Sequence, residues 1–175
     1  MLVTVLGIIA IALVALLATA ALRPDHFRIE RSTRVAAVPG KAYALINDFH
    51  HWPQWSPWEN KDPTMKKTLS GADAGPGAIY EWEGNNQVGK GRMEITDSTP
   101  DARVLIKLDF YKPFEAHNTA EFTIAPDGDG SRVTWAMYGP QPFMARLMGI
   151  FFSMEKMVGP DFEAGLAKLA AAAGK

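Results

Sequence analysis

The side chains that most often take part in catalysis or metal binding are few and far apart in this sequence. Its four histidines do not form a metal-binding set: His50 and His51 are adjacent and diverge at the end of a predicted helix, and His26 and His117 lie far from them. The chain has no cysteine, which excludes thiol catalysis, a disulfide framework and a cysteine-ligated zinc or iron–sulfur site. We therefore expect no metal ion and no cofactor.

Five carboxylates alternate with apolar residues along predicted strands, and their parity places all of them on the outer, solvated face of a sheet. They are Glu81, Glu83, Glu94, Asp109 and Glu121. Acid–base catalysis at neutral pH needs a carboxylic acid whose pKa is raised by its surroundings, and a solvated face does not provide this. The sequence therefore assigns no catalytic residue.

Aromatic and methionine side chains give the strongest signal of a functional site. Inward-facing strand residues, together with tryptophans from a preceding turn and apolar residues from a C-terminal helix, would line a large apolar cavity of the kind that holds small molecules. Methionine is an adaptable side chain that recurs where a surface repacks around varied ligands. The expected cavity wall consists of Trp55, Trp58, Tyr80, Trp82, Met93, Phe110, Asn118, Phe122, Trp135, Met137, Met144, Met148 and Phe151. The alternative is that these side chains simply fill a core.

Two polar residues, Arg31 and Asn118, fall on the same inward face by parity. A polar side chain that faces a cavity can fix the orientation of a ligand. The alternative for both residues is a hydrogen-bonded position or an exposed one at the rim.

An antiparallel sheet must position these residues. Apolar and polar residues alternate with a period of two, which is typical of strands with one wet face. The alternating segments are 27–37, 78–83, 91–96, 103–111, 117–124 and 132–137, with a weaker strand at 64–69. Pro39 begins a short helix that runs through about Asp48, and a second short helix or turn holds Trp52, Trp55 and Trp58.

The C-terminal third changes to helical spacing. Apolar residues from Phe143 to Leu169 recur every three or four positions, which predicts one continuous helix of about 28 residues. Gly159 and Pro160 interrupt the stripe without changing its phase, so a kink is expected there. The small residues from Ala170 to Gly174 are expected to fray.

The first 22 residues contain no charged side chain, and the run from Leu2 to Leu22 is long enough to span a bilayer as a helix. An uncleaved anchor is favoured, because no lysine or arginine precedes the run and it exceeds the usual apolar length of a signal peptide. A cleaved signal with Ala18-Thr19-Ala20 as its site, and a buried helix, are the alternatives. Four arginines follow the run, and the positive-inside rule then places a single-pass chain with its domain in the cytoplasm.

The composition fits one ordinary folded domain behind this leader. The 175 residues include 18 Lys and Arg against 19 Asp and Glu, for a net charge of −1, and 47% are apolar. A near-neutral charge argues against a nucleic-acid partner, which requires a basic surface. The apolar content excludes disorder. We divide the chain into an anchor (1–22), a stalk (23–26), a ligand-binding domain (27–170) and a tail (171–175).

The order of elements, and several short motifs, resemble the START/Bet v 1-like superfamily, in particular the polyketide cyclase/dehydrase branch of SRPBCC proteins. The matching runs are His51-Trp52-Pro53-Gln54-Trp55-Ser56-Pro57-Trp58, Tyr80-Glu81-Trp82-Glu83-Gly84-Asn85, Leu108-Asp109-Phe110, Asn118-Thr119-Ala120-Glu121-Phe122 and Lys156-Met157-Val158-Gly159. The resemblance covers roughly 27–170. It implies an α+β helix-grip fold, in which a curved antiparallel sheet surrounds a long C-terminal helix, with a ligand cavity between them.

Three functions remain open from the sequence. The first is a membrane-anchored domain that binds a hydrophobic or amphipathic small molecule, lipid-like or polyketide-like. The second is a cyclase/dehydrase-like enzyme that uses the same cavity to fold a reactive chain and exclude water. The third is a non-enzymatic scaffold or regulatory module whose core is filled.

Overall fold

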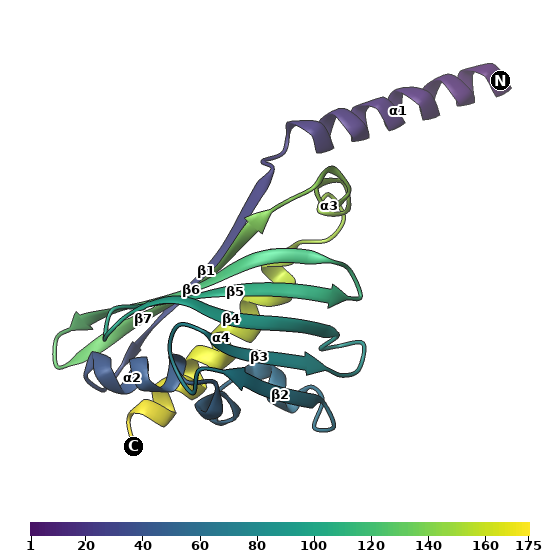
Figure 1. Ribbon diagram of the computed structural model, residues 1–175. Coiled ribbons are helices and arrows are strands. Elements are labelled where there is room, and N and C mark those ends of the chain that lie inside the picture. The colour runs from purple at the N-terminus through teal and green to yellow at the C-terminus, as the bar shows by residue number, and fades with distance from the viewer.

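The computed structural model describes all residues, 1–175, as an isolated N-terminal helix followed by a sheet wrapped around a C-terminal helix (Figure 1). The seven strands form one antiparallel sheet in the order β1-β7-β6-β5-β4-β3-β2. Helix α4 (Met154–Ala173) lies against the inner face of this sheet. The strands are β1 (His26–Val35), β2 (Lys66–Gly71), β3 (Ala78–Glu83), β4 (Lys90–Thr99), β5 (Arg103–Lys112), β6 (Ala116–Asp127) and β7 (Gly130–Pro140). The predicted arrangement of strands and C-terminal helix is confirmed.

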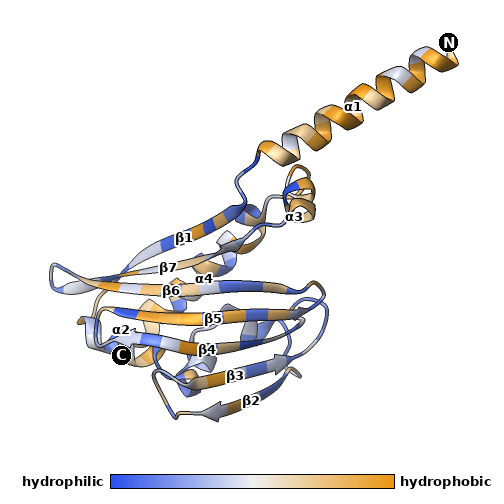
Figure 2. Ribbon diagram, turned by 45° about the horizontal axis from the view of Figure 1, so that its top comes forward, coloured by the Kyte–Doolittle hydropathy of each residue, from blue (hydrophilic) through white to orange (hydrophobic).

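The period-two pattern of the sequence reappears as alternating burial along the strands. In β4, for example, Gly91, Met93 and Ile95 are buried, whereas Arg92 and Glu94 on the opposite face are partly exposed. Figure 2 shows the resulting bands of apolar and polar residues across the sheet. The inner face packs into a core of 28 buried residues that begins at Ile29 and ends at Ala173.

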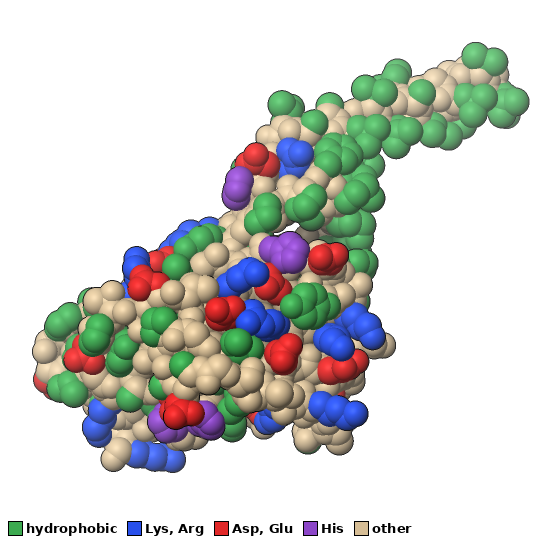
Figure 3. Space-filling model, viewed as in Figure 1, with side chains coloured by type: hydrophobic (Ala, Val, Ile, Leu, Met, Phe, Trp, Pro, Cys, Tyr) green, Lys and Arg blue, Asp and Glu red, His purple; other side chains and the backbone are tan.

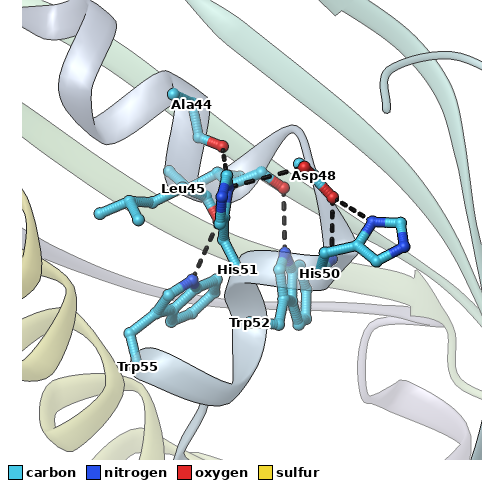
Figure 4. Close-up of polar contacts among 8 residues, drawn as sticks. Ala44, Leu45, Asp48, His50, His51, Trp52 and Trp55 are labelled. Atoms are coloured by element: carbon cyan, nitrogen blue, oxygen red, sulfur yellow. Dashed lines mark hydrogen bonds and ion pairs between the residues drawn. The ribbon is translucent and has the colours of Figure 1, made fainter. Parts of the chain in front are cut away.

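Two short helical turns close one side of the core after helix α2 (Pro39–Ile46). They are η1 (Phe49–Gln54) and η2 (Pro57–Asn60). Asp48 caps η1 by accepting a hydrogen bond from the backbone N–H of His50. The indole N–H groups of Trp52 and Trp55 donate to the carbonyls at the end of α2, as Figure 4 shows. These bonds fix the tryptophan-rich turn against the helix that precedes it.

The prediction of one continuous C-terminal helix is wrong. The segment forms a short helix, α3 (Phe143–Met148), and then α4, with an interruption at 149–153 rather than at Gly159 and Pro160. The side chain of Ser153 starts α4 by accepting a hydrogen bond from the N–H of Lys156. Pro160 lies inside α4, which continues to the buried residue Ala173, so the helix extends beyond the expected domain end at 170.

Arg31 lies on the inner face, as its parity predicted, and joins β1 to α4. Its guanidinium group forms ion pairs with two carboxylates of α4, Glu155 at 2.6 Å and Glu163 at 2.7 Å. It passes directly over Gly159, where a Cβ atom would collide with it. Arg31 therefore ties the helix to the edge of the sheet instead of facing a cavity.

Asp109 differs from the other outer-face carboxylates because it is buried. His117 on the neighbouring strand contacts it at 2.7 Å and Lys107 at 3.0 Å. Burial alone would raise the pKa of Asp109, but the hydrogen bonds from His117 and Lys107 hold it below its ordinary value. The same hydrogen bond raises the pKa of His117.

Helix α1 (Leu2–Leu22) stands apart from the core, and Ala20 is its one buried residue. It is long and apolar enough to cross a membrane. The alternative of a buried helix does not fit, because nearly all of its surface is exposed (Figure 1).

Candidate ligand pocket

A pocket of about 320 Å³ lies between the inner face of the sheet and α4. Of its 19 lining residues, 15 are hydrophobic. Seven of the expected wall residues line it, namely Trp58, Tyr80, Trp82, Met93, Phe110, Trp135 and Met137. The volume is at the lower end of the range for small-molecule sites, and an apolar wall with a few polar groups is typical of them.

Stacked aromatic rings form the wall where β7 meets α4. The rings of Trp135 and Phe162 are parallel within 4°, with centroids 4.1 Å apart. Trp58 meets the ring of Trp135 edge-on at 5.5 Å. Such contacts hold the rings in defined positions, so this part of the wall keeps its shape without a ligand.

Two further residues of the expected wall support it from behind. Trp55 and Phe122 are completely buried and pack edge to face at 5.9 Å. Neither lines the pocket, but each contacts a residue that does: Trp55 packs against Trp135, and Phe122 packs against Trp52. They belong to the core that positions the wall.

Four expected wall residues lie away from the pocket. Met144, Met148 and Phe151 belong to α3 and the turn that follows it, and all three side chains are exposed. They do not face the sheet because the helix is interrupted after Met148, so α3 follows a different direction from α4. Asn118 is partly buried, with its side-chain oxygen against Gly139 of the adjacent strand, outside the pocket.

The rim of the pocket carries polar groups that the sequence pattern did not reveal. The ammonium group of Lys61, which follows η2, contacts the carboxylate of Asp161 in α4 at 2.5 Å. Both residues line the pocket, as do Ser56 and Gln87. The apolar interior therefore opens next to an ion pair, an arrangement that suits a molecule with one polar end.

A second polar contact lies at the wall itself. The hydroxyl of Tyr80 donates a hydrogen bond to Glu59 at 3.1 Å, and Glu59 also pairs with Lys67. Burial raises the pKa of Tyr80, and the negative charge of Glu59 raises it further. Tyr80 is therefore a neutral hydrogen-bond donor at the pocket wall throughout the physiological pH range.

The pocket opens at one end of the sheet. Its more exposed lining residues are Gln87 in the β3–β4 hairpin, Lys61 after η2, and Met157 in the first turns of α4. The strand register places this hairpin at the end of the sheet where β1 begins and β7 finishes, because Lys90 pairs with Lys112 and His26 pairs with Pro140. The mouth is therefore on the side of the molecule from which α1 emerges.

A second, smaller hollow of about 190 Å³ lies between η1 and the strands β2 and β3. Its lining includes His50, Ser70 and Asp73, and most of it faces solvent. No cluster of three or more histidine, cysteine or acidic side chains suited to a metal ion is found in the molecule. The larger pocket is the candidate site.

Comparison with known protein families matches residues 26–174 to polyketide cyclase / dehydrase and lipid transport proteins. The chain belongs to this family. The match includes the whole sheet and α4, and it leaves out α1. The family is part of the SRPBCC superfamily, whose members bind hydrophobic ligands. The resemblance seen in the sequence is thereby confirmed.

Solved structures show the same fold at low sequence identity. A protein from Chromobacterium violaceum has a TM-score of 0.60 with 16% identity over 87% of this chain and 99% of its own. A protein from Thermobifida fusca has a TM-score of 0.60 with 22% identity over 84% of this chain and 93% of its own. The Bet v 1-like protein Ara h 8.0201 has a TM-score of 0.56 with 10% identity over 85% of this chain and 97% of its own. No curated protein matches the sequence.

Proposed function

We propose that the chain holds an apolar or amphipathic small molecule, lipid-like or polyketide-like, in the pocket between the sheet and α4. The observation that supports the proposal is a mainly apolar cavity whose lining includes the Lys61–Asp161 ion pair. A hydrocarbon or ring system would occupy the interior, and its polar end would face this pair. A filled core, as in the scaffold alternative, would leave no such space.

The expected affinity follows from the apolar area that a small ligand would bury. Burial of about 300 Å² of apolar surface at roughly 25 cal/mol per Å² contributes about 7–8 kcal/mol. Loss of ligand freedom on association offsets part of this, so a dissociation constant in the micromolar to submicromolar range is expected.

A pair of tryptophan substitutions tests the site. Val158→Trp enlarges a half-buried wall residue of α4 and should abolish saturable binding of a naphthalene-type or fatty-acid fluorescent probe. Met148→Trp makes a similar change on the exposed surface of α3 and should leave binding intact. The measurement uses the chain from Asp25 onward, which contains the entire core. Equal binding by both variants would refute the pocket assignment.

The second candidate function is a cyclase/dehydrase-like reaction in the same pocket. Asp161 and Lys61 favour it, because they place a carboxylate and an ammonium group, the kinds of group that transfer protons, beside an apolar cavity. Asp161→Asn should then abolish turnover of a linear polyketide mimic while it retains probe binding. Absence of turnover by the unaltered chain would leave ligand binding as the function.

The proposal includes a membrane anchor. We infer that α1 spans the bilayer once and remains attached, with the domain on the cytoplasmic side. Four arginines follow the apolar run closely, namely Arg23, Arg28, Arg31 and Arg34. A lipid-like ligand suits an anchored domain, because such molecules partition into the bilayer.

A further inference from the structure

An apolar surface lies beside the point where α1 leaves the domain. Residues 141–154 contain a single charge, Arg146, and the large side chains of this segment are exposed to a degree that is unusual for a water-facing surface. We call these side chains the α3 patch. It consists of Phe143, Met144, Met148, Phe151 and Phe152 from this segment, together with the exposed Met157, which follows Glu155 and Lys156 in the first turn of α4.

The α3 patch is attached to the end of α1. The guanidinium group of Arg146 donates hydrogen bonds to the carbonyls of Ala21 and Arg23, each at 3.2 Å. Arg23 in turn packs over Gly149, where a Cβ atom would lie 3.1 Å from its guanidinium nitrogen. Helix α3 is thus fixed against the last turn of α1, and Figure 3 shows apolar side chains covering α1 and continuing onto the part of the domain beside it.

The α3 patch also reaches the mouth of the pocket. Met157 is exposed and at the same time lines the pocket from the first turns of α4. The β5–β6 hairpin, which carries the exposed Phe114, lies at the same end of the sheet. The membrane helix, the α3 patch and the pocket mouth therefore share one end of the molecule.

We propose that the α3 patch is a membrane-docking surface: it lies in the lipid interface next to α1 and holds the pocket mouth against the bilayer, so that the ligand enters from the lipid phase. The occupant of the patch is the bilayer, because the patch is continuous with the apolar surface of α1. Apolar side chains of interfacial helices enter the boundary between headgroups and acyl chains by roughly 5–10 Å. Arg23 and Arg146 then lie at headgroup level, where their charges meet lipid phosphates.

This inference rests on the proposed anchor and pocket, and the experiment separates them. The chain contains no cysteine, so single cysteines can be labelled specifically. Full-length Phe151→Cys and Met148→Cys variants, labelled with an environment-sensitive fluorophore, are reconstituted in vesicles of phosphatidylcholine and phosphatidylglycerol. Leu13→Cys in α1 reports on the anchor, and Val38→Cys is an exposed apolar control at the opposite end of the sheet.

Quenching by brominated lipid should be strong at Phe151 and Met148, strong at Leu13 and absent at Val38. Aqueous iodide should quench Val38 alone. Quenching at Leu13 without quenching at the two patch positions would overturn the docking surface and leave the anchor intact. Labels at Phe151 and Met148 that are shielded from iodide but not quenched by lipid would indicate a second copy of the chain on the patch. This result would also overturn the membrane-docking surface. No lipid quenching at Leu13 would remove the anchor and this inference with it.

A transfer measurement tests the entry route. Full-length Phe151→Asp should take up an apolar fluorescent probe from vesicles several-fold more slowly than the unaltered chain, with the final bound fraction unchanged. Val38→Asp, the matched substitution at the far end, should leave the rate unaltered. An uptake rate that is the same for all three proteins would contradict entry through the lipid-facing mouth.

Discussion

At the scale of single residues, two tryptophans three positions apart have different roles. Trp55 is completely buried, and its indole N–H donates to the carbonyl of Leu45, whereas Trp58 is half-buried and lines the pocket. Trp55→Ala should reduce the free energy of unfolding by about 3–5 kcal/mol, because it opens a cavity in a packed core. Trp58→Ala should reduce the free energy of unfolding by clearly less, and it should instead weaken binding of the fluorescent probe. Urea denaturation of the chain from Asp25 measures the loss of stability in each variant, and equal losses would mean that Trp58 is also part of the core.

The Asp109–His117 pair predicts a pH dependence. Pairing raises the pKa of His117 above its ordinary value of 6.5, so its stabilisation is complete at lower pH and is lost as the pH rises through the raised pKa. The lowered pKa of Asp109 has the opposite effect: its stabilisation is present above the ordinary value of 3.8 and is lost as the pH falls through the lowered pKa. His117→Gln should therefore destabilise the fold more at about pH 5.5 than at about pH 9.

Denaturation curves at the two pH values check this prediction. In an Asp109→Asn background, the effect of His117→Gln should differ much less between the two pH values, because the main partner charge is gone and only Glu115, at 3.4 Å from the imidazole, remains. Since the imidazole is largely exposed, added salt should reduce the difference. An equal effect of His117→Gln at both pH values in the unaltered chain would show that the pair does not contribute.

Residue parity in the sequence located much of the pocket wall but not its polar rim. Alternation along the strands identifies which side chains face inward, and this is sufficient for Tyr80, Trp82 and Trp135. Lys61 lies in an irregular segment, where no periodicity indicates direction, and its partner Asp161 is 100 positions away. The burial of Asp109 also escaped prediction, because the alternation along β5 places this residue on the outer face, and its partner His117 comes from the neighbouring strand.

At the scale of elements, the packing of β4 against its neighbouring strands requires a glycine at position 91. Gly91 faces the indole ring of Trp82, and a Cβ atom there would overlap both that ring and the backbone carbonyl of Asp109. Gly91→Ala should therefore destabilise the fold by about 1–3 kcal/mol, the usual cost of overpacking a core. Gly174→Ala, at the end of α4 with only ordinary contacts, should change stability by less than about 0.5 kcal/mol. Thermal or urea denaturation compares the two, and a neutral Gly91→Ala would contradict the packing of β3 on β4.

The elements themselves were predictable to different degrees. The sheet was predicted strand by strand, because each strand has its own two-residue alternation. The apolar stripe from Phe143 onward gave a wrong prediction of one continuous helix. The apolar residues keep their three-to-four spacing through 149–153, although the backbone is not helical there. The interruption is set by the cap at Ser153 and by the contact between α3 and α1, and the latter joins residues that are more than 120 positions apart.

At the scale of the whole molecule, the apolar leader predicts how the protein fractionates. Full-length protein should remain in the membrane pellet after a carbonate wash, and a chain that starts at Asp25 should be recovered in solution, because the core lies entirely beyond α1. A mature N-terminus at Ala21 would instead demonstrate a cleaved signal. Protease added to intact cells should leave the domain undigested, whereas digestion from outside would reverse the proposed orientation.

The strand order has a consequence for how the protein is made. β1 is the first strand to leave the ribosome, yet it pairs only with β7, the last strand, about a hundred residues later. Part of the pocket wall comes from α4, which follows all seven strands in the chain. Pairing of distant segments slows folding, and an unpaired strand is exposed to aggregation while it waits. The first strand of the nascent domain therefore stays unpaired until β7 has been made, and the pocket can form only after α4 has left the ribosome.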